Sequence, residues 1–231
     1  MKTAILLDGH FSRIHLRSLT KKNATRKRLD ALAEASLIDG EMSSGIYYYD
    51  CSPYSEILNL PISNTPHDFS KDPNYYMAKR MQGKLRADQH FHLRRGQLSF
   101  DGWALRPECL EELKNKPRRL VDEDFEPRIR QKQVDLLIGI DMAKLAIKKE
   151  VERMVLVTSD SDLVPAIKYA QTRGVKVFLI TSDRAKAILK QSCQRRHVDL
   201  DKLKRLLPDD FPIEVVLPDA PQSSQAIPPI Q

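Results

Sequence analysis

The sequence lacks long apolar runs and paired cysteines. Its longest apolar stretches, at residues 154–157 and 175–180, are strand-sized, whereas a membrane-spanning helix needs about 20 apolar residues. The apolar run at residues 4–7 is too short for a signal peptide. The three cysteines lie far apart, with no Cys-x-x-Cys pair, which excludes a disulfide framework and a cysteine zinc site. These absences favour a cytoplasmic protein without a membrane partner.

The composition is that of an ordinary globular chain. Of its 231 residues, 41% are hydrophobic and 30% are charged, which excludes an intrinsically disordered chain and suits one large domain or two small ones. Lys and Arg number 38 and Asp and Glu number 31, so the net charge is +7. This excess permits a polyanionic partner without requiring one, and the positions of the charges therefore matter more than their sum.

Short apolar stretches alternate with helical patterns along the chain. Strands are expected at residues 4–7, 45–49, 154–157 and 175–180; the first and the last two are apolar runs bounded by polar residues, and 45–49 is aromatic and β-branched. This alternation predicts an α/β fold with a central parallel sheet flanked by helices. Helices are expected at residues 22–36, 75–86, 131–149, 162–173, 184–194 and 200–207.

Two regions depart from this alternation. Residues 91–106 are predicted to form an inserted β-hairpin with its turn at Arg95-Gly96, and residues 115–127 are predicted to form a connecting loop. From residue 208 the chain is rich in proline, which is typical of a tail. The folded domain is therefore expected to span residues 1–207.

The tail is expected to span residues 208–231. Its start, at residues 213–217, is apolar and β-branched and could add an edge strand to the sheet.

Acidic residues follow two of the predicted strands directly. Asp8 ends the first strand, and Asp160 and Asp162 follow the third. Because ligands bind outside the carboxyl ends of parallel strands, we expect these three carboxylates to converge if the strands are neighbours. Asp135 opens a predicted helix, and Asp141 lies on the apolar stripe of that helix. A carboxylate there is unfavourable unless it is paired or binds a cation.

Clustered carboxylates repel one another unless a cation neutralises them. A hard divalent ion, Mg²⁺ or Mn²⁺, suits an all-oxygen site. Such an ion can activate a water molecule and stabilise a phosphoryl oxygen during in-line attack. Together with the basic surface, the acids predict phosphodiester hydrolysis.

Each acid also has a purely structural interpretation. Asp8 and Gly9 could form a turn, and Asp135 could serve the dipole of its helix. Asp162 could cap the following helix, and Asp141 could form a salt bridge with a lysine.

The pattern of these acids resembles the NYN domain family, a PIN-like nuclease group with a bacterial branch. The family has Lys-x-Val-Asp at a helix start with a second Asp six residues on, which here corresponds to Lys132, Asp135 and Asp141. The pattern Ser/Thr-x-Asp-Ser-Asp-Phe/Leu-x-Pro follows, here at residues 158–165. The strand that ends at Asp8 also fits, and the resemblance extends over about residues 1–205.

The resemblance implies a three-layer PIN-like fold and a divalent-metal-dependent endoribonuclease that acts on RNA. Carried over to this sequence, it places Asp8, Asp135, Asp160 and Asp162 at catalytic and metal-binding positions. It adds Asp141 as a fifth metal ligand. The implied cofactor is Mg²⁺ or Mn²⁺, and the implied partner is RNA.

Basic and aromatic residues near the acidic edge are candidates for RNA contacts. His10 and Phe11 could stack on unpaired bases, as could Phe91 and Trp103, although Trp103 equally suits the core of the hairpin. Phosphate contacts are expected from the basic side chains of Arg94, Arg95, Arg106 and Lys132.

Two other functions fit parts of the sequence. Phe11 stands where many NYN relatives have Asn, and Gln133 where many have Gly, which permits an RNA-binding or regulatory module with weak or no catalysis. The segment from Asp160 to Asp162 also mimics the nucleophile loop of haloacid-dehalogenase phosphatases. That loop usually comes early in its chain, so the order of motifs disfavours this class. A homodimer is left open.

Overall fold

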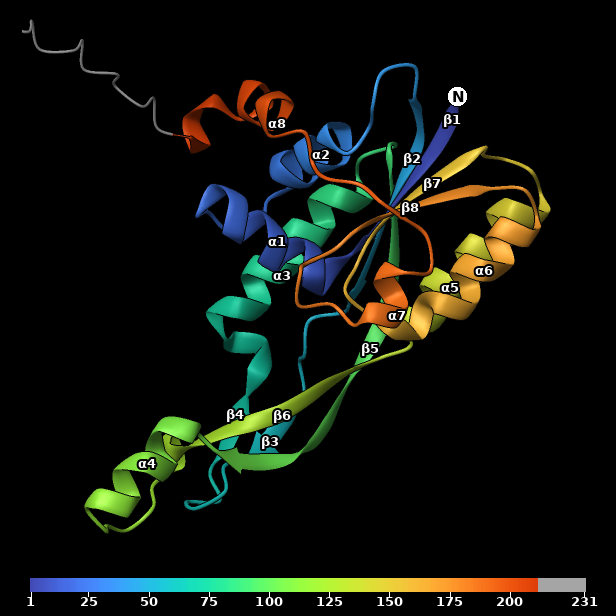
Figure 1. Cartoon of the computed structure of the whole chain (residues 1–231). Coiled ribbons are helices and arrows are strands. Elements are labelled where there is room, and N and C mark those ends of the chain that lie inside the picture. The colour runs from blue at the N-terminus through green and yellow to red at the C-terminus, as the bar shows by residue number, and fades with distance from the viewer. Residues whose placement is uncertain (212–231) are drawn as a thin grey trace, which may run out of the picture.

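A computed structural model describes residues 1–211 and contains a seven-stranded sheet between two layers of helices (Figure 1). The strand order is β6-β5-β2-β1-β7-β8-β9, and every neighbouring pair is parallel except β5 and β6. The predicted α/β fold with a mostly parallel central sheet is confirmed. The strands are β1 (Lys2–Asp8), β2 (Met42–Cys51), β5 (Phe91–Leu105), β6 (Phe125–Lys132), β7 (Arg153–Val157), β8 (Lys176–Ile180) and β9 (Gln194–Arg195).

The two helical layers enclose two separate cores, one on each face of the sheet. The sheet buries alternate residues on opposite faces, so Leu6 of β1 contributes to one core and Leu7 to the other. Both are fully buried, which explains why residues 4–7 read as an unbroken apolar run. One layer holds α5 (Val134–Ile147), α6 (Val164–Thr172) and α7 (Ala187–Lys190); the other holds α1 (Gly9–Thr20), α2 (Arg26–Ala35), α3 (Pro73–Arg86) and α8 (Leu200–Leu206).

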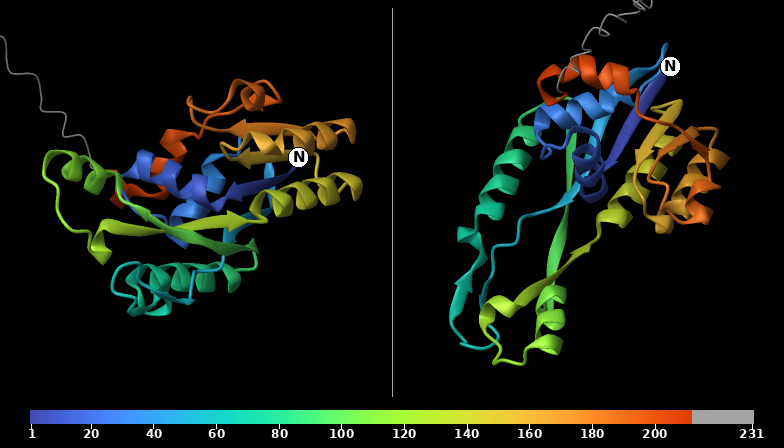
Figure 2. Two further views of the ribbon diagram at one scale, coloured as in Figure 1. Left: turned by 90° about the horizontal axis from the view of Figure 1, so that it is seen from below. Right: turned by 60° about the vertical axis from the view of Figure 1, so that its left-hand side comes forward.

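Residues 97–132, here called the arm, project from the sheet away from the N-terminus (Figure 2). Strand β5 pairs with β2 as far as Gly96 and then continues without a turn to pair with antiparallel β6. The predicted turn at Arg95-Gly96 is therefore wrong: the two strands of the hairpin are β5 and β6, and helix α4 (Pro107–Asn115) lies between them. A short sheet of β3 (Ile57–Asn59) and β4 (Pro66–Asp68) lies beside the arm.

Other boundaries differ from the predicted ones. The helix predicted at 184–194 is reduced to α7 and is followed by β9. The loop predicted at 115–127 already contains the start of β6. Residues 213–217, where an edge strand was expected, lie outside the described residues. Among residues 1–211, no helix has the length and apolar content that a bilayer span requires.

Candidate functional site

The carboxyl ends of the adjacent central strands β1 and β7 border a depression of about 430 Å³. From β1 the chain passes to β2 on one side, whereas β7 and β8 extend the sheet on the other. In open α/β sheets such a point is where ligands bind. The depression, here called the acidic depression, is lined by Asp8, His10, Phe11, Gln131, Val134, Asp135, Ser159, Asp160, Ser161 and Lys186.

Asp8 is the best-anchored acid of the acidic depression. It caps α1: Oδ1 accepts hydrogen bonds from the backbone N–H groups of His10 (3.1 Å) and Phe11 (3.3 Å). Its other oxygen, Oδ2, accepts a hydrogen bond from the hydroxyl of Thr158 (2.9 Å). Burial raises the pKa of Asp8, while the bond from Thr158 and the backbone bonds act in the opposite direction. The predicted turn at Asp8 is thus the start of a helix.

Thr158 connects Asp8 to Asp160. Its hydroxyl, which is fully buried, also accepts a hydrogen bond from the backbone N–H of Asp160 (3.1 Å). The carboxylate of Asp160 in turn accepts the backbone N–H of Asp162 (2.8 Å) and caps the short helical turn that leads into α6. The capping acid is therefore Asp160. Asp162 is exposed and does not line the depression.

Asp135 stands opposite these residues in the first turn of α5. Partial desolvation and the negative charges of Asp160, Asp8 and Asp162 raise its pKa to about 6. An electrostatic effect of this kind requires the four carboxylates to be near one another. The structure therefore brings together Asp8, Asp135 and Asp160 in the acidic depression, with Asp162 beside it.

Asp141 does not join this group, which corrects the expectation that it is a fifth metal ligand. It is buried on the inner side of α5 and accepts hydrogen bonds from the Tyr49 hydroxyl (3.1 Å) and from Nε of Arg94 (2.9 Å). Its partner is therefore an arginine on β5, not the lysine of the structural interpretation. Arg94, expected to contact RNA phosphate, is engaged with Asp141 instead.

The other predicted RNA-contact residues are dispersed. His10 and Phe11 line the acidic depression, but the Phe11 side chain is buried and stacks on His15. Arg95 and Lys132 are exposed on β5 and β6. Arg106 lies on the arm, where its Nε donates to the carbonyl oxygen of Phe125 (3.3 Å). Of the two further stacking candidates, Phe91 is buried in a core and Trp103 lies on the arm.

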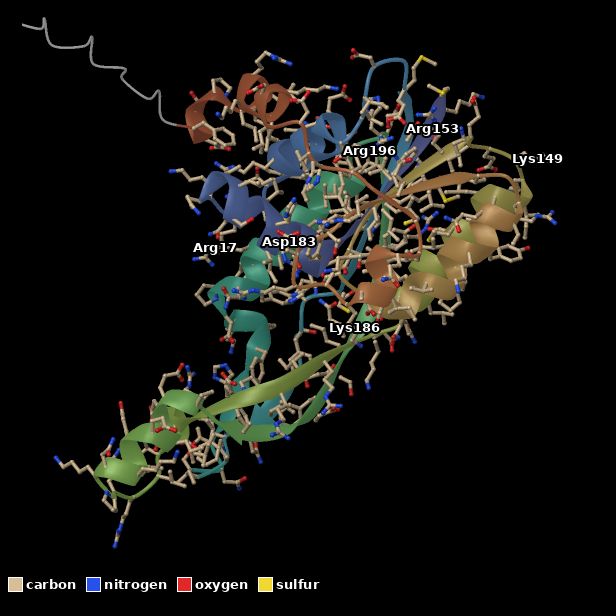
Figure 3. All side chains as sticks on the ribbon, in the orientation of Figure 1. Arg17, Lys149, Arg153, Asp183, Lys186 and Arg196 are labelled. Carbon is tan, nitrogen blue, oxygen red and sulfur yellow. The ribbon has the colours of Figure 1, made fainter. Side chains whose placement is uncertain are left out.

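Thr158 and Lys186 also belong to the site, and neither was predicted from the sequence as a site residue. Lys186 lies in the loop after β8, and it borders the acidic depression. Figure 3 shows it at the end of the sheet opposite Arg153 and Arg196. The available signal was positional, because a loop that follows a parallel strand lies at the same edge as Asp8 and Asp160.

A known protein family matches part of this fold. The NYN domain family matches residues 100–201. This part of the chain is similar to NYN domains, and the NYN family belongs to the PIN-like superfamily. NYN domains are generally nucleases, and PIN-like nucleases usually use divalent metal ions. The wider domain limits, 1–207, stay a prediction.

Individual relatives are distant. An uncharacterized protein of Methanocaldococcus jannaschii is 33% identical over 64 residues, which are 28% of this chain and 27% of that protein. The match thus spans about a quarter of the relative's length. A crystal structure of a protein of unknown function from Vibrio parahaemolyticus has a TM-score of 0.46 at 16% identity and covers 84% of this chain and 90% of its own. Neither relative assigns a function.

Proposed function

We propose that this protein is a divalent-metal-dependent endoribonuclease that hydrolyses RNA phosphodiester bonds at the acidic depression. The observation that carries the proposal is the convergence of Asp8, Asp135 and Asp160 on one depression at the carboxyl ends of β1 and β7, where desolvation and the neighbouring carboxylates raise the pKa of Asp135 to about 6. Such a group is unfavourable by itself and becomes favourable when a cation neutralises it. The NYN match over residues 100–201 supports a nuclease at the level of the family.

The donor set fits a hard cation that retains much of its water. Within residues 1–211, no three His, Cys, Asp or Glu side chains are grouped closely enough to hold a metal ion between them. Mg²⁺ commonly binds through one or two carboxylates, with water molecules and substrate phosphates as the remaining ligands. One or two of the acids Asp8, Asp135 and Asp160 would supply these carboxylate oxygens.

Different residues of the site have different roles in the proposed hydrolysis. Thr158 fixes the orientation of Asp8 and the position of Asp160, so these acids need little reorganisation when substrate binds. Asp135 faces Asp8 and Asp160, and a bound cation would neutralise the repulsion that helps to raise its pKa in the metal-free protein. Lys186 at the rim offers a positive charge to a phosphate. When bound, Mg²⁺ or Mn²⁺ supplies Lewis acidity and a water of lowered pKa.

The test is cleavage of single-stranded RNA by the purified protein with Mg²⁺ or Mn²⁺. Asp8→Asn and Asp160→Asn are expected to abolish cleavage while circular dichroism shows an unchanged fold. Asp39→Asn is the matched control, because Asp39 is an exposed acid outside the acidic depression and its replacement is expected to retain full activity. Cleavage that persists in both site variants overturns the proposal.

An RNA-binding module with weak or no catalysis is the second candidate. Its support is Phe11, whose buried ring occupies the wall of the acidic depression at a position where many NYN relatives have a polar side chain. RNA binding without cleavage under any divalent ion would favour this function.

A further inference from the structure

The acidic depression is one end of a longer groove. A second hollow of about 540 Å³ lies between α1, α3 and the start of the arm, and Gln131 lines both. A third hollow of about 650 Å³, here called the arm hollow, shares Pro53, Asn74 and Ala78 with the second. The three hollows therefore lie next to one another and share walls, and the row that they form is here called the groove.

The length of this groove follows from the spacing of residues along β6. Gln131 lines its acidic end, whereas Pro127 and Phe125 of the same strand line the arm hollow. A strand rises about 3.4 Å per residue, so the two ends lie roughly 14–20 Å apart. At the stacked spacing of about 3.4 Å per nucleotide, this distance corresponds to about four to six nucleotides.

The arm hollow is walled by aromatic rings from three separate segments. Tyr54 and His67 each contact the ring of Phe69 edge-on, with ring centroids 5.3 and 4.7 Å apart, and the Trp103 ring lies 6.3 Å from Phe69. At these distances the rings contact one another as ordinary aromatic pairs. Together they line one side of a hollow whose volume falls within the range of ligand pockets.

The polar groups of the arm hollow suit a neutral planar ligand. The carboxylate of Asp122 accepts the backbone N–H groups of Ile62 (2.8 Å) and Ser63 (3.2 Å), and Asp72 is bonded to His67 (3.0 Å). Three acids, Asp72, Asp122 and Glu123, stand against one cation, Arg106, in the lining, and carboxylates accept hydrogen bonds from the exocyclic amino groups of bases. A nucleobase therefore fits this hollow better than a phosphate does.

The middle hollow has the opposite character. Arg13 and Arg17 of α1 line it, and Figure 3 shows Arg17 projecting from the surface of α1. Arg13 is paired with Asp50, whereas Arg17 is exposed and offers its charge to a backbone phosphate. The groove thus presents acids, then a cation, then aromatic rings along one line.

We propose that the arm hollow binds an unpaired base of a single-stranded RNA whose cleaved bond lies at the acidic depression, about four to six nucleotides away. This inference rests on the proposed function for the position of the cleaved bond. The substrate class that follows is an unpaired strand long enough to reach from the acids to the arm. Aromatic stacking accepts any base, so the groove selects for single-strandedness and length.

The fluorescence of Trp103 reports directly on binding at the arm hollow, because Trp103 is the only tryptophan of the chain and it lines this hollow. Intrinsic fluorescence is recorded while single-stranded RNA is added to Asp160→Asn protein, in which the bound strand is expected to stay intact. An oligonucleotide of about ten nucleotides is expected to quench Trp103, whereas one of about three nucleotides cannot span both sites and is expected to quench only at a higher concentration. A duplex of the longer length is expected to give no quenching, because its bases are paired and stacked.

A pair of variants localises the effect. Tyr54→Leu removes one wall of the arm hollow and is expected to weaken binding of the longer strand roughly tenfold, from the strength of base–aromatic stacking. Tyr76→Leu is the control, because Tyr76 is an exposed aromatic that does not line the arm hollow, and it is expected to bind like the parent.

The outcomes separate this inference from the proposed function. Cleavage by the parent protein combined with an unchanged Trp103 signal overturns the inference and leaves the nuclease intact. Quenching by the longer strand, combined with no cleavage by the parent protein, supports the arm hollow as a base site and overturns the nuclease. Equal quenching by the duplex overturns the inference, and a short strand that quenches at the same concentration as the longer one overturns the span of about four to six nucleotides.

Discussion

At the scale of single residues, the acids of the depression differ in what surrounds them. Asp8 is held by two backbone N–H groups and the Thr158 hydroxyl, which stabilise its charge. Asp135 faces three other carboxylates, and its pKa is raised to about 6. Asp8 is thus held in one orientation, whereas Asp135 has a pKa close to neutral pH.

The raised pKa predicts that Asp135→Asn stabilises the protein at neutral pH. An acid whose pKa is higher in the folded than in the unfolded chain contributes its full stability at low pH, and that contribution is lost as the pH rises through about 6. Removing the charge should therefore raise the melting temperature at about pH 7.5 by a few degrees, equivalent to about 1 kcal/mol after allowance for solvent screening. Thermal denaturation without divalent ions measures this.

The same experiment at about pH 4 provides the control, because both proteins then carry a neutral side chain at position 135. The melting temperatures are expected to agree there. A variant that is less stable than the parent at neutral pH would show that Asp135 is not under repulsion. Its activity is expected to be lost at every pH.

Thr158 is predicted to be a positioning residue. Thr158→Val keeps the shape of the side chain but removes the bonds to Asp8 and to the N–H of Asp160, which should cost about 1–3 kcal/mol of stability. We expect kcat to fall roughly tenfold with little change in KM, because substrate is not contacted directly. Thr158→Ser retains the hydroxyl and should restore kcat; equal loss in both variants would refute the role.

At the scale of elements, Gly96 decides how the arm leaves the sheet. A Cβ atom at this position would lie 2.3 Å from the carbonyl oxygen of Lys132, just where β5 changes its partner from β2 to β6. Gly96→Ala is therefore expected to push the arm away from the sheet and lower the free energy of unfolding by about 2 kcal/mol. Urea denaturation measures the loss.

Gly83 offers a matched control within a helix. A Cβ atom there meets nothing within 4 Å, so Gly83→Ala in α3 should gain about 0.5–1 kcal/mol from helix propensity. If both alanine variants shift stability in the same direction, the close approach at Gly96 is not what constrains the arm.

The elements that could be predicted were those whose sequence signal is local. Residues 4–7 and 154–157 are fully buried on both faces, so an apolar run sufficed. The arm could not be predicted in the same way, because Gln97 of β5 pairs with Lys132, far along the chain. Alternating polarity shows that a strand exists and does not show its partner, so a nearby turn was inferred where the strand continues.

At the scale of the whole molecule, topology made part of the site predictable. Asp8 and Asp160 come from distant segments, yet the rule that ligands bind at the carboxyl ends of parallel strands predicted their convergence, and the family resemblance added Asp135. The prediction that Asp141 is a metal ligand was wrong, because its place on an apolar stripe shows only that its side chain faces the core. Its neutralising neighbour, Arg94, is determined by the packing of α5 on β5. The groove was unpredictable, since α1, α3 and the arm meet only in the folded chain.

This division of acids predicts how divalent cations act on overall stability. Mn²⁺ at about 100 times its dissociation constant should stabilise the parent by about 2.7 kcal/mol at pH 7.5, and less at pH 5, where Asp135 is protonated. Asp160→Asn should lose this response.

Asp141→Asn should melt several degrees lower than the parent, because Arg94 is left unpaired. It should nevertheless keep the full Mn²⁺ shift in melting temperature. Tyr49→Phe removes only one hydrogen bond to Asp141 and is a milder test of the same point. Loss of the shift in these two variants would make Asp141 part of the cation site after all.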